Sequence, residues 1–320
     1  MATAEQIKNL VKAHINHDEE RFKTVVLQIA AYEAKRNHET FARELKEFAK
    51  KIGSNKSNIL KINNQNPMLT MTSPTNRLSD LVVSEDIYNR IQRVLNEFRN
   101  RKRLQQYGLC NRRKILIEGK PGTGKSFTAS VIASELNLPL YTVQMDKLVT
   151  KFMGETSVKL RQVFESMESS MGVYFFDEFD AIGADRSLDN EVGEMRRILN
   201  SFLQFIELDE SDSIIIAATN NPKLLDQALY RRFDDILHYD MPTKNEVERL
   251  FKSKLKVNCF GNFEITEELL GKAMTLSHAE IIHACNDAIK YSILSNEDIT
   301  EKLLLSMLEE RVSAYSLEGA

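Results

Sequence analysis

From Lys114 to about residue 242, short apolar runs alternate with stretches of helical periodicity. The runs read KILIE, LPLYTV, VYFFD, SIIIAAT and DDILHY, and each carries β-branched or aromatic residues. Continuous apolar strands separated by helices are typical of a parallel sheet with both faces covered. The pattern therefore predicts an α/β fold with a five-stranded parallel sheet and helices on both faces.

Helical periodicity without strands occupies the two ends of the chain. Before Gly53, apolar residues such as Val25 and Ile29 recur at the spacing of one helix face, which predicts a small helical unit. From Thr243, which forms a predicted capping box with Glu246, the helical pattern returns and continues to the end of the chain. This tail is predicted to be a helical lid behind the α/β part.

The segment between the N-terminal helices and the α/β part is rich in Asn, Ser and Thr and contains two prolines. That composition is typical of a linker. A long helix over residues 85–106, capped by Ser84, is predicted to follow it. We therefore expect a helical unit that serves for docking or solubility, a flexible linker, an α/β domain and a lid, over residues 1–52, 53–76, 77–242 and 243–320.

Composition and charge argue against general polyanion binding, against a cysteine framework and against a membrane protein. A formal net charge of −3 over 320 residues gives no reason to expect a general affinity for polyanions. The three cysteines lie far apart without CxxC spacing, which indicates reduced thiols and neither a disulfide framework nor a metal site. No apolar run approaches the length of a membrane span, and the charged N-terminus lacks the core of a signal peptide. We expect a cytoplasmic protein without a membrane partner.

The segment GKPGTGKS, residues 119–126, matches the pattern G-x-x-x-x-G-K-[ST] between a predicted strand and a predicted helix. Its glycines let the backbone N–H groups converge on phosphate oxygens, and the helix N-terminus adds partial positive charge. Lys125 is expected to reach the β- and γ-phosphates, and the Ser126 hydroxyl to hold Mg²⁺. The expected nucleotide-binding residues of this segment are Pro121, Gly122, Thr123, Gly124, Lys125, Ser126 and Phe127.

Two further strands end in polar residues that suit hydrolysis of a nucleoside triphosphate. The run VYFFDEFD places Asp177 and Glu178 at the carboxyl end of a strand, where such sheets bind ligands. Asp177 suits Mg²⁺, and Glu178 suits polarising the water that attacks the γ-phosphate. Asp180 is interpreted as a helix cap or structural acid. Asn220, after the run SIIIAAT, is expected to hold the same water or to sense the γ-phosphate.

Five segments occur together: GKPGTGKS, FFDEFDAIG, AATNNPKLLDQAL, RRFDD and KFMGETSVKLRQVF. With this combination the chain resembles the AAA ATPases, a clade of the AAA+ superfamily, over about residues 77–294. The resemblance implies a P-loop NTPase (AAA+) fold, ATP and Mg²⁺ as ligands, and homo-oligomeric rings, usually hexamers, that pull on proteins. The N-terminal helices and the compact RRFDD are similar to bacterial single-ring members, some of which are paired with a subtilisin-like serine protease, so such a partner is also implied.

The resemblance adds residues that the motifs above do not include. Arg231 and Arg232 match the arginine-finger segment, which supplies a guanidinium to the γ-phosphate of a neighbouring subunit. Because the family usually separates these arginines by a short insert that is missing here, which of the two reaches the phosphate stays open. Ala279 aligns with an alanine near the adenine. Asp80 and Val82 lie in a stretch that resembles the family's adenine-contacting segment.

The loop KFMGETS places two apolar residues directly before a glycine. From composition alone, Phe152 and Met153 either tuck inward or are displayed to grip a ligand. In AAA ATPases the corresponding loop carries an aromatic residue, an apolar residue and a glycine into the central pore. The resemblance therefore implies that Phe152, Met153 and Gly154 grip an extended protein substrate, with Lys151 assisting.

The favoured function is therefore an ATP-driven unfoldase or remodelling motor. The alternative is an ATP-controlled switch that regulates or inhibits a partner protease or effector, with docking through residues 1–52 and no threading. A third class, remodelling of nucleic acid through the basic run RNRKR, is disfavoured because such runs are usually solvated helix ends. The sequence specifies neither the protein substrate nor the number of subunits.

Overall fold

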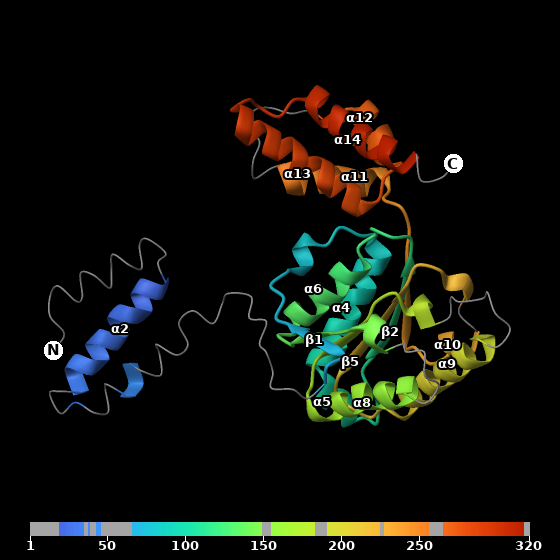
Figure 1. Ribbon diagram of the computed structural model, residues 1–320. Helices are drawn as coiled ribbons and strands as arrows, with labels where there is room; N and C mark the ends of the chain where they lie inside the picture. The colour runs from blue at the N-terminus through green and yellow to red at the C-terminus, as the bar shows by residue number, and fades with distance from the viewer. Residues whose placement is uncertain are drawn as a thin grey trace. The chain divides into compact units, whose positions relative to one another are not determined.

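The computed structural model describes residues 19–34, 38, 43–45, 66–148, 155–182, 191–224, 227–255 and 265–316. The chain divides into two compact units, Met1–Leu60 and Lys61–Ala320. The first unit contains helix α2 (Glu19–Ala34), labelled in Figure 1. This helix buries Val25 and Ile29, two of the positions that helical spacing placed on one face. The second unit contains the α/β part and the lid.

A six-stranded sheet with the strand order β1-β3-β4-β5-β2-β6 forms the centre of the second unit. Neighbouring strands are parallel except for β1 and β3, which are antiparallel. The five parallel strands coincide with the five apolar runs, which confirms the predicted α/β fold. The strands are β1 (Leu69–Thr72), β2 (Lys114–Gly119), β3 (Leu140–Val143), β4 (Val173–Phe176), β5 (Ile214–Thr219) and β6 (Asp235–Tyr239).

Strand β1 corrects the prediction of a five-stranded sheet and lies inside the segment 53–76, where a linker was expected. Leu69 pairs with Val143 and Thr72 with Leu140, so β1 extends the edge of the sheet beside β3. The run LTMT is short and is flanked by prolines, asparagines and serines. An edge strand of this length has little apolar pattern of its own, because only the pairing with β3 defines it.

The helices of the α/β part are α4 (Glu85–Arg99), α5 (Arg101–Gln105), α6 (Lys125–Glu135), α7 (Met145–Leu148), α8 (Glu155–Ser169), α9 (Glu191–Leu208) and α10 (Gln227–Tyr230), with 3₁₀ turns η1 (Leu78–Asp80), η2 (Phe179–Ile182) and η3 (Pro222–Leu224). Ser84 caps α4, as predicted, by accepting a hydrogen bond from the Ile87 N–H. The single helix predicted over 85–106 is instead interrupted at Asn100. The Asn100 side chain donates to the Asn96 carbonyl at 2.8 Å, and such side-chain bonds compete with the helical backbone.

Helices cover both faces of the sheet, as continuous apolar strands require. On one face, side chains such as Ile115 and Ile216 form a core with residues of α4 and α6. On the other face, Leu116 and Phe176 form a second core with residues of α8 and α9. Figure 1 shows α4 beside α6 and α8 beside α9. This packing fixes the carboxyl ends of β2, β4 and β5 at one edge of the sheet.

The lid is a helical domain with a hydrophobic core of its own, to which Val82 of the α/β part also contributes. The predicted capping box at its start is confirmed, because the Thr243 N–H donates to Glu246 Oε2 at 2.7 Å and the Glu246 N–H donates to Thr243 Oγ1 at 3.4 Å. Arg249 Nη1 donates to the Val83 carbonyl at 3.1 Å and joins the lid to the α/β part. The lid helices are α11 (Lys244–Leu255), α12 (Glu267–Ala273), α13 (His278–Ser295) and α14 (Glu301–Ser316).

Two further expectations concern the membrane and the cysteines. Among the described residues, no helix has both the length and the apolar character that crossing a membrane requires. Cys110 is exposed and Cys285 is buried, and Cys259 lies outside the described residues.

Candidate active site

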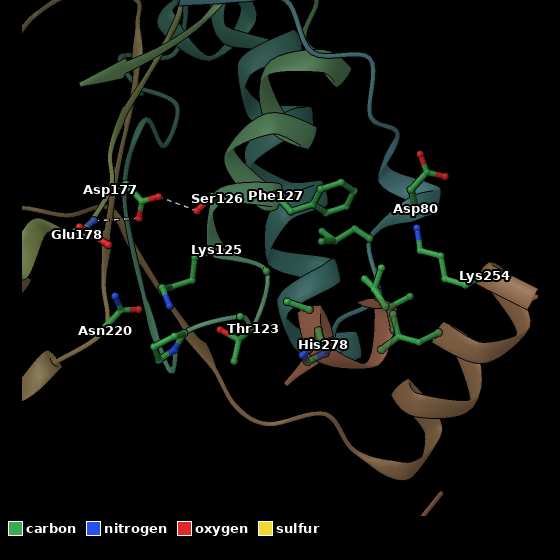
Figure 2. A pocket seen from close by; sticks show the side chains of 18 residues that line it. Asp80, Thr123, Lys125, Ser126, Phe127, Asp177, Glu178, Asn220, Lys254 and His278 are labelled. Carbon is green, nitrogen blue, oxygen red and sulfur yellow. Dashed lines mark hydrogen bonds between the residues drawn. The ribbon is translucent and has the colours of Figure 1, made fainter. Parts of the chain in front are cut away.

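A cavity of about 410 Å³ lies at the carboxyl ends of β2, β4 and β5, between the α/β part and the lid. Figure 2 shows Asp177, Glu178 and Asn220 at one end of it and Asp80 and Lys254 at the other. We refer to these as the phosphate end and the base end. The sequence-predicted residues that line the cavity are Asp80, Val82, Pro121, Gly122, Thr123, Gly124, Lys125, Ser126, Phe127, Asp177, Glu178, Asn220 and Ala279.

The loop between β2 and α6 needs glycine at two positions. Gly122 and Gly124 have φ angles of +74° and +105°, a region that residues with a Cβ atom rarely adopt. A Cβ atom on Gly122 would also lie 2.4 Å from Ser277 Oγ of the lid. The backbone of the loop therefore lies directly against the lid, without a side chain between them. The Gly122 carbonyl accepts a hydrogen bond from the Ala279 N–H at 2.9 Å.

Lys125 lies at the start of α6 with its ammonium turned back over the loop. Its Nζ donates to the carbonyls of Gly119 and Lys120 at 2.7 and 2.8 Å. Burial lowers the pKa of Lys125, and the carboxylates of Asp177 and Asp180 oppose that shift. A partly desolvated ammonium attracts an anion more strongly than one in water, so this group suits phosphate oxygens.

Ser126 and Asp177 meet across the cavity floor from α6 and from the end of β4. The Ser126 hydroxyl donates to Asp177 Oδ2 at 2.8 Å, and the other carboxylate oxygen of Asp177 accepts from the Glu178 N–H at 3.0 Å. A hydroxyl and a carboxylate held together are hard oxygen donors of the kind that Mg²⁺ prefers beside substrate phosphates. The residues present therefore fit a magnesium ion.

Glu178 has an unusual backbone conformation. Its φ angle is +50°, in the left-handed region that costs a non-glycine residue about 1 to 3 kcal/mol. The Glu178 side chain lines the same end of the cavity as Lys125 and Asn220 (Figure 2). Strain of this kind is typical of functional positions that the surrounding structure holds in place.

Asp180 fixes the loop that carries Asn220. Its Oδ1 accepts hydrogen bonds from the Thr219 hydroxyl and from the Asn220 N–H, both at 3.2 Å. Asp180 is therefore the structural acid that the sequence indicated. It follows β4 and holds the backbone of Asn220, which follows the neighbouring strand β5.

The base end includes residues that the motifs did not predict. Leu250 and Lys254 come from α11, and Ile282 lies one helical turn after Ala279 on α13. Leu81, Val82, Leu250 and Ile282 give this end an apolar lining of the kind that receives a planar base. The helical pattern of the lid predicted apolar side chains at Leu250 and Ile282, but it did not indicate that they face a cavity.

His278 also lines the base end and was not among the predicted site residues. Its side chain is buried, and neither ring nitrogen has a hydrogen-bond partner among the described residues. Burial lowers the pKa of His278, and the Glu246 carboxylate acts in the opposite direction. The imidazole therefore favours its neutral form, with one N–H donor and one acceptor available.

Arg231 and Arg232 do not line the cavity of their own chain. Both are exposed on the turn that follows α10. Arg232 forms an ion pair with Glu207 at 2.9 Å, whereas Arg231 makes no ion pair with any described residue. The predicted pore-loop residues Lys151, Phe152, Met153 and Gly154 lie outside the described residues.

Comparison with known proteins places the chain among AAA proteins. Residues 115–241 match the profile of the ATPase family associated with various cellular activities (AAA). The chain is 33% identical over 307 residues to the uncharacterized AAA family ATPase y4kL of Sinorhizobium fredii, and this similarity covers 92% of the present chain and 90% of y4kL.

Other relatives are longer than this chain. The uncharacterized AAA domain-containing protein ycf46 of Guillardia theta is 27% identical over 312 residues, which cover 96% of the chain and 59% of ycf46. The ATP-dependent zinc metalloprotease FtsH of Mycoplasma mobile is 29% identical over 245 residues, which cover 74% of the chain and 34% of FtsH. By its similarity to y4kL over nearly the whole length of both proteins, this chain belongs to the AAA family, and it is an ATPase.

Proposed function

We propose that the chain is an ATP-driven protein-remodelling motor that works as a homo-oligomeric ring, usually a hexamer in this family. One arrangement supports this proposal most. Lys125, Glu178 and Asn220 converge on one end of the cavity, whereas Arg231 and Arg232 are exposed outside it. A site whose arginines lie elsewhere is completed when a second copy of the chain presents them.

In this proposal, the triphosphate lies along the glycine-rich loop and the adenine lies at the base end. The backbone N–H groups of the loop and the Lys125 ammonium bind the phosphate oxygens. Ser126 and Asp177 would hold Mg²⁺, which supplies positive charge to the β- and γ-phosphates. Asp80, Val82 and Ala279 border the base, and the apolar side chains around them exclude water.

Glu178 is proposed to orient the attacking water and to accept its proton. Its turn away from the strand brings the carboxylate to the end of the cavity that Lys125 also lines. The Asn220 amide holds the same water or the γ-phosphate, and its backbone is fixed by Asp180. The reaction needs orientation more than a strong base, so a carboxylate of ordinary basicity suffices.

Of the two arginines, Arg231 is proposed as the one that reaches the neighbouring γ-phosphate. Arg232 already pairs with Glu207 of its own chain, and this pair would have to break before the guanidinium could reach across. Arg231 is exposed and has no such pair with the residues that the structure describes. Arg232 is proposed to hold the turn and to assist.

The mechanical part of the proposal concerns the loop of Lys151, Phe152, Met153 and Gly154. It is supported by the family resemblance and by relatives named as ATP-dependent proteases. The chain spans about a third of those FtsH proteins, so the metalloprotease activity in their name is not carried over. A separate subtilisin-like serine protease is proposed as a partner on the resemblance alone.

A Glu178→Gln variant tests the ATPase part of the proposal. ATP binding should be retained, because the amide keeps the shape of the carboxylate. Turnover should fall on the order of 10² to 10⁴-fold, because the water loses its proton acceptor. Assembled rings should accumulate with ATP, because the triphosphate stays bound. Steady-state hydrolysis, nucleotide titration and sedimentation velocity with ATP measure these three consequences. Undiminished turnover, or a variant that stays monomeric with saturating ATP, would contradict the proposal.

A Phe152→Ala variant separates the motor from the ATP-controlled switch. A motor should keep its ATPase activity and lose ATP-dependent unfolding of a captured substrate, because the aromatic grip is gone. A switch threads no substrate, so the variant should keep both its ATPase activity and its ATP-controlled docking to a partner. The substrate is obtained by affinity capture on the Glu178→Gln protein, which holds what the ring has engaged.

A further inference from the structure

Tyr230 stands where three parts of the site meet. It is the last residue of α10 and directly precedes Arg231 and Arg232. Its hydroxyl lies 3.0 Å from Glu118 Oε2 and 3.3 Å from the Pro222 carbonyl. The side chain therefore touches the strand that leads into the phosphate-binding loop and the turn that follows Asn220, while its backbone carries the arginine pair.

Glu118 is placed to hold this tyrosine by the register of the sheet. It is the last residue before Gly119, and it pairs with Thr219 on β5 and with His238 on β6. Its side chain is 13% exposed, and its second oxygen accepts from His238 Nδ1. With both oxygens engaged, the carboxylate has little freedom to turn away from Tyr230.

Tyr230 remains a hydrogen-bond donor throughout the physiological pH range. Burial, together with the bond to the Glu118 carboxylate, raises the pKa of Tyr230 to about 12. A neutral hydroxyl that donates to a carboxylate forms a charge-assisted bond, which is stronger than a bond between neutral groups.

The segment around the arginines depends on such anchors. Helix α10 has four residues, too few to keep a fixed orientation by itself. The buried side chains of Leu229 and Phe233 hold the turn on the apolar side. On the polar side, Asp234 joins the turn to the start of β2, because its Oδ2 accepts from the Arg113 and Lys114 N–H groups. The Tyr230 hydroxyl joins the turn to the other end of β2, next to the phosphate-binding loop.

We propose that Tyr230 is a positioning residue that links the phosphate-binding loop of one subunit, through Glu118, to the arginines that this subunit presents to its neighbour. The inference rests on the proposed role of Arg231 and Arg232. A shift of the loop at Gly119 moves Glu118, and the hydrogen bond carries that shift to the turn that bears the guanidinium groups. The state of one site thereby affects hydrolysis in the next.

The test is a Tyr230→Phe variant, which removes the hydroxyl and keeps the ring. Its affinity for ATP should stay within about twofold, because Tyr230 does not line the cavity, and its kcat should fall roughly tenfold. Tyr88→Phe is the matched control. Tyr88 is a partly buried tyrosine of α4 whose hydroxyl accepts, among the described residues, a 3.4 Å bond from Gln92, so its removal should leave kcat unchanged. Thermal melting of both variants confirms that each is folded.

Mixing with Glu178→Gln subunits then identifies the site on which Tyr230 acts. Those subunits cannot hydrolyse ATP but present intact arginines. If Tyr230 positions the arginines, Tyr230→Phe subunits regain activity beside Glu178→Gln subunits. The mixture then hydrolyses ATP faster than the summed rates of the two separate proteins. An unchanged kcat, or a lowered kcat that mixing does not restore, would overturn the inference. The same mixing with an Arg231→Ala, Arg232→Ala protein tests the arginines themselves, so a failure of the proposed function would be seen separately.

Discussion

The phosphate end and the base end of the cavity are built from the chain in different ways. At the phosphate end, Lys125 and Ser126 are adjacent in the sequence, and Asp177 and Glu178 follow one strand. Their polar groups are engaged with one another or with nearby backbone before any ligand is considered. This end is preorganised by local sequence, and its chemistry can therefore be recognised in short motifs.

At the base end, the lining comes from three segments that are far apart in the sequence: residues 80–82, helix α11 and the start of α13. Apolar side chains prevail there, and His278 has two ring nitrogens without described partners. The fold of the lid, and not a motif, brings these groups together. The comparison teaches that the type of reaction is determined by local sequence, whereas the fit to the base depends on how two domains pack.

The largest effect on the affinity for ATP should come from the phosphate end, with Lys125→Ala. The phosphate end would lose the buried Lys125 ammonium, so the affinity for ATP should fall about 100-fold, as expected for loss of charge-assisted hydrogen bonds. Isothermal titration with ATP measures the change. Lys102→Ala, an exposed lysine of α5, should bind as the wild type does. Equal affinities of both variants would remove Lys125 from the site.

A smaller effect should follow from Asp180→Ala. Asp180 does not line the cavity, but its carboxylate fixes the backbone of Asn220, which does. The Asn220 N–H and the Thr219 hydroxyl would lose their shared acceptor, so kcat should fall about tenfold while the affinity for ATP is kept. Asp212→Ala, at the opposite end of β5, is the control. A rise in the dissociation constant with an unchanged kcat would assign Asp180 to binding instead.

The sequence could predict features that contiguous residues form, and it could not predict features that depend on pairing or packing between distant segments. The strands, the phosphate-binding loop and the acidic pair were recognisable because each is contiguous and has its own pattern. Strand β1 was not, because its four residues are defined only by pairing with β3. The Tyr230–Glu118 bond joins residues 112 positions apart, and it depends on the register of β2 against its neighbours. The ring nitrogens of His278 have no hydrogen-bond partner among the described residues, a feature that depends on the packing of the lid.

The smallest effect concerns the base end and the pH dependence of stability. Burial holds the pKa of His278 below its ordinary value of 6.5. As the pH falls through that value, the unfolded chain binds a proton that the folded chain does not, so the wild type loses stability. A His278→Gln variant lacks this loss. Urea denaturation at about pH 7.5 and about pH 5.5 should therefore show the wild type losing more stability than the variant. Parallel losses would mean that His278 is readily protonated in the folded protein.

The central claim is that ATP is hydrolysed in a site that two neighbouring subunits share. The most direct measurement mixes two proteins that should each be inactive, Glu178→Gln and the Arg231→Ala, Arg232→Ala double variant, and follows phosphate release. A shared site predicts that activity appears in the mixture, because intact arginines then face intact Glu178 carboxylates at some interfaces. A mixture as inactive as its components, or a double variant that hydrolyses ATP at the wild-type rate by itself, would contradict the claim.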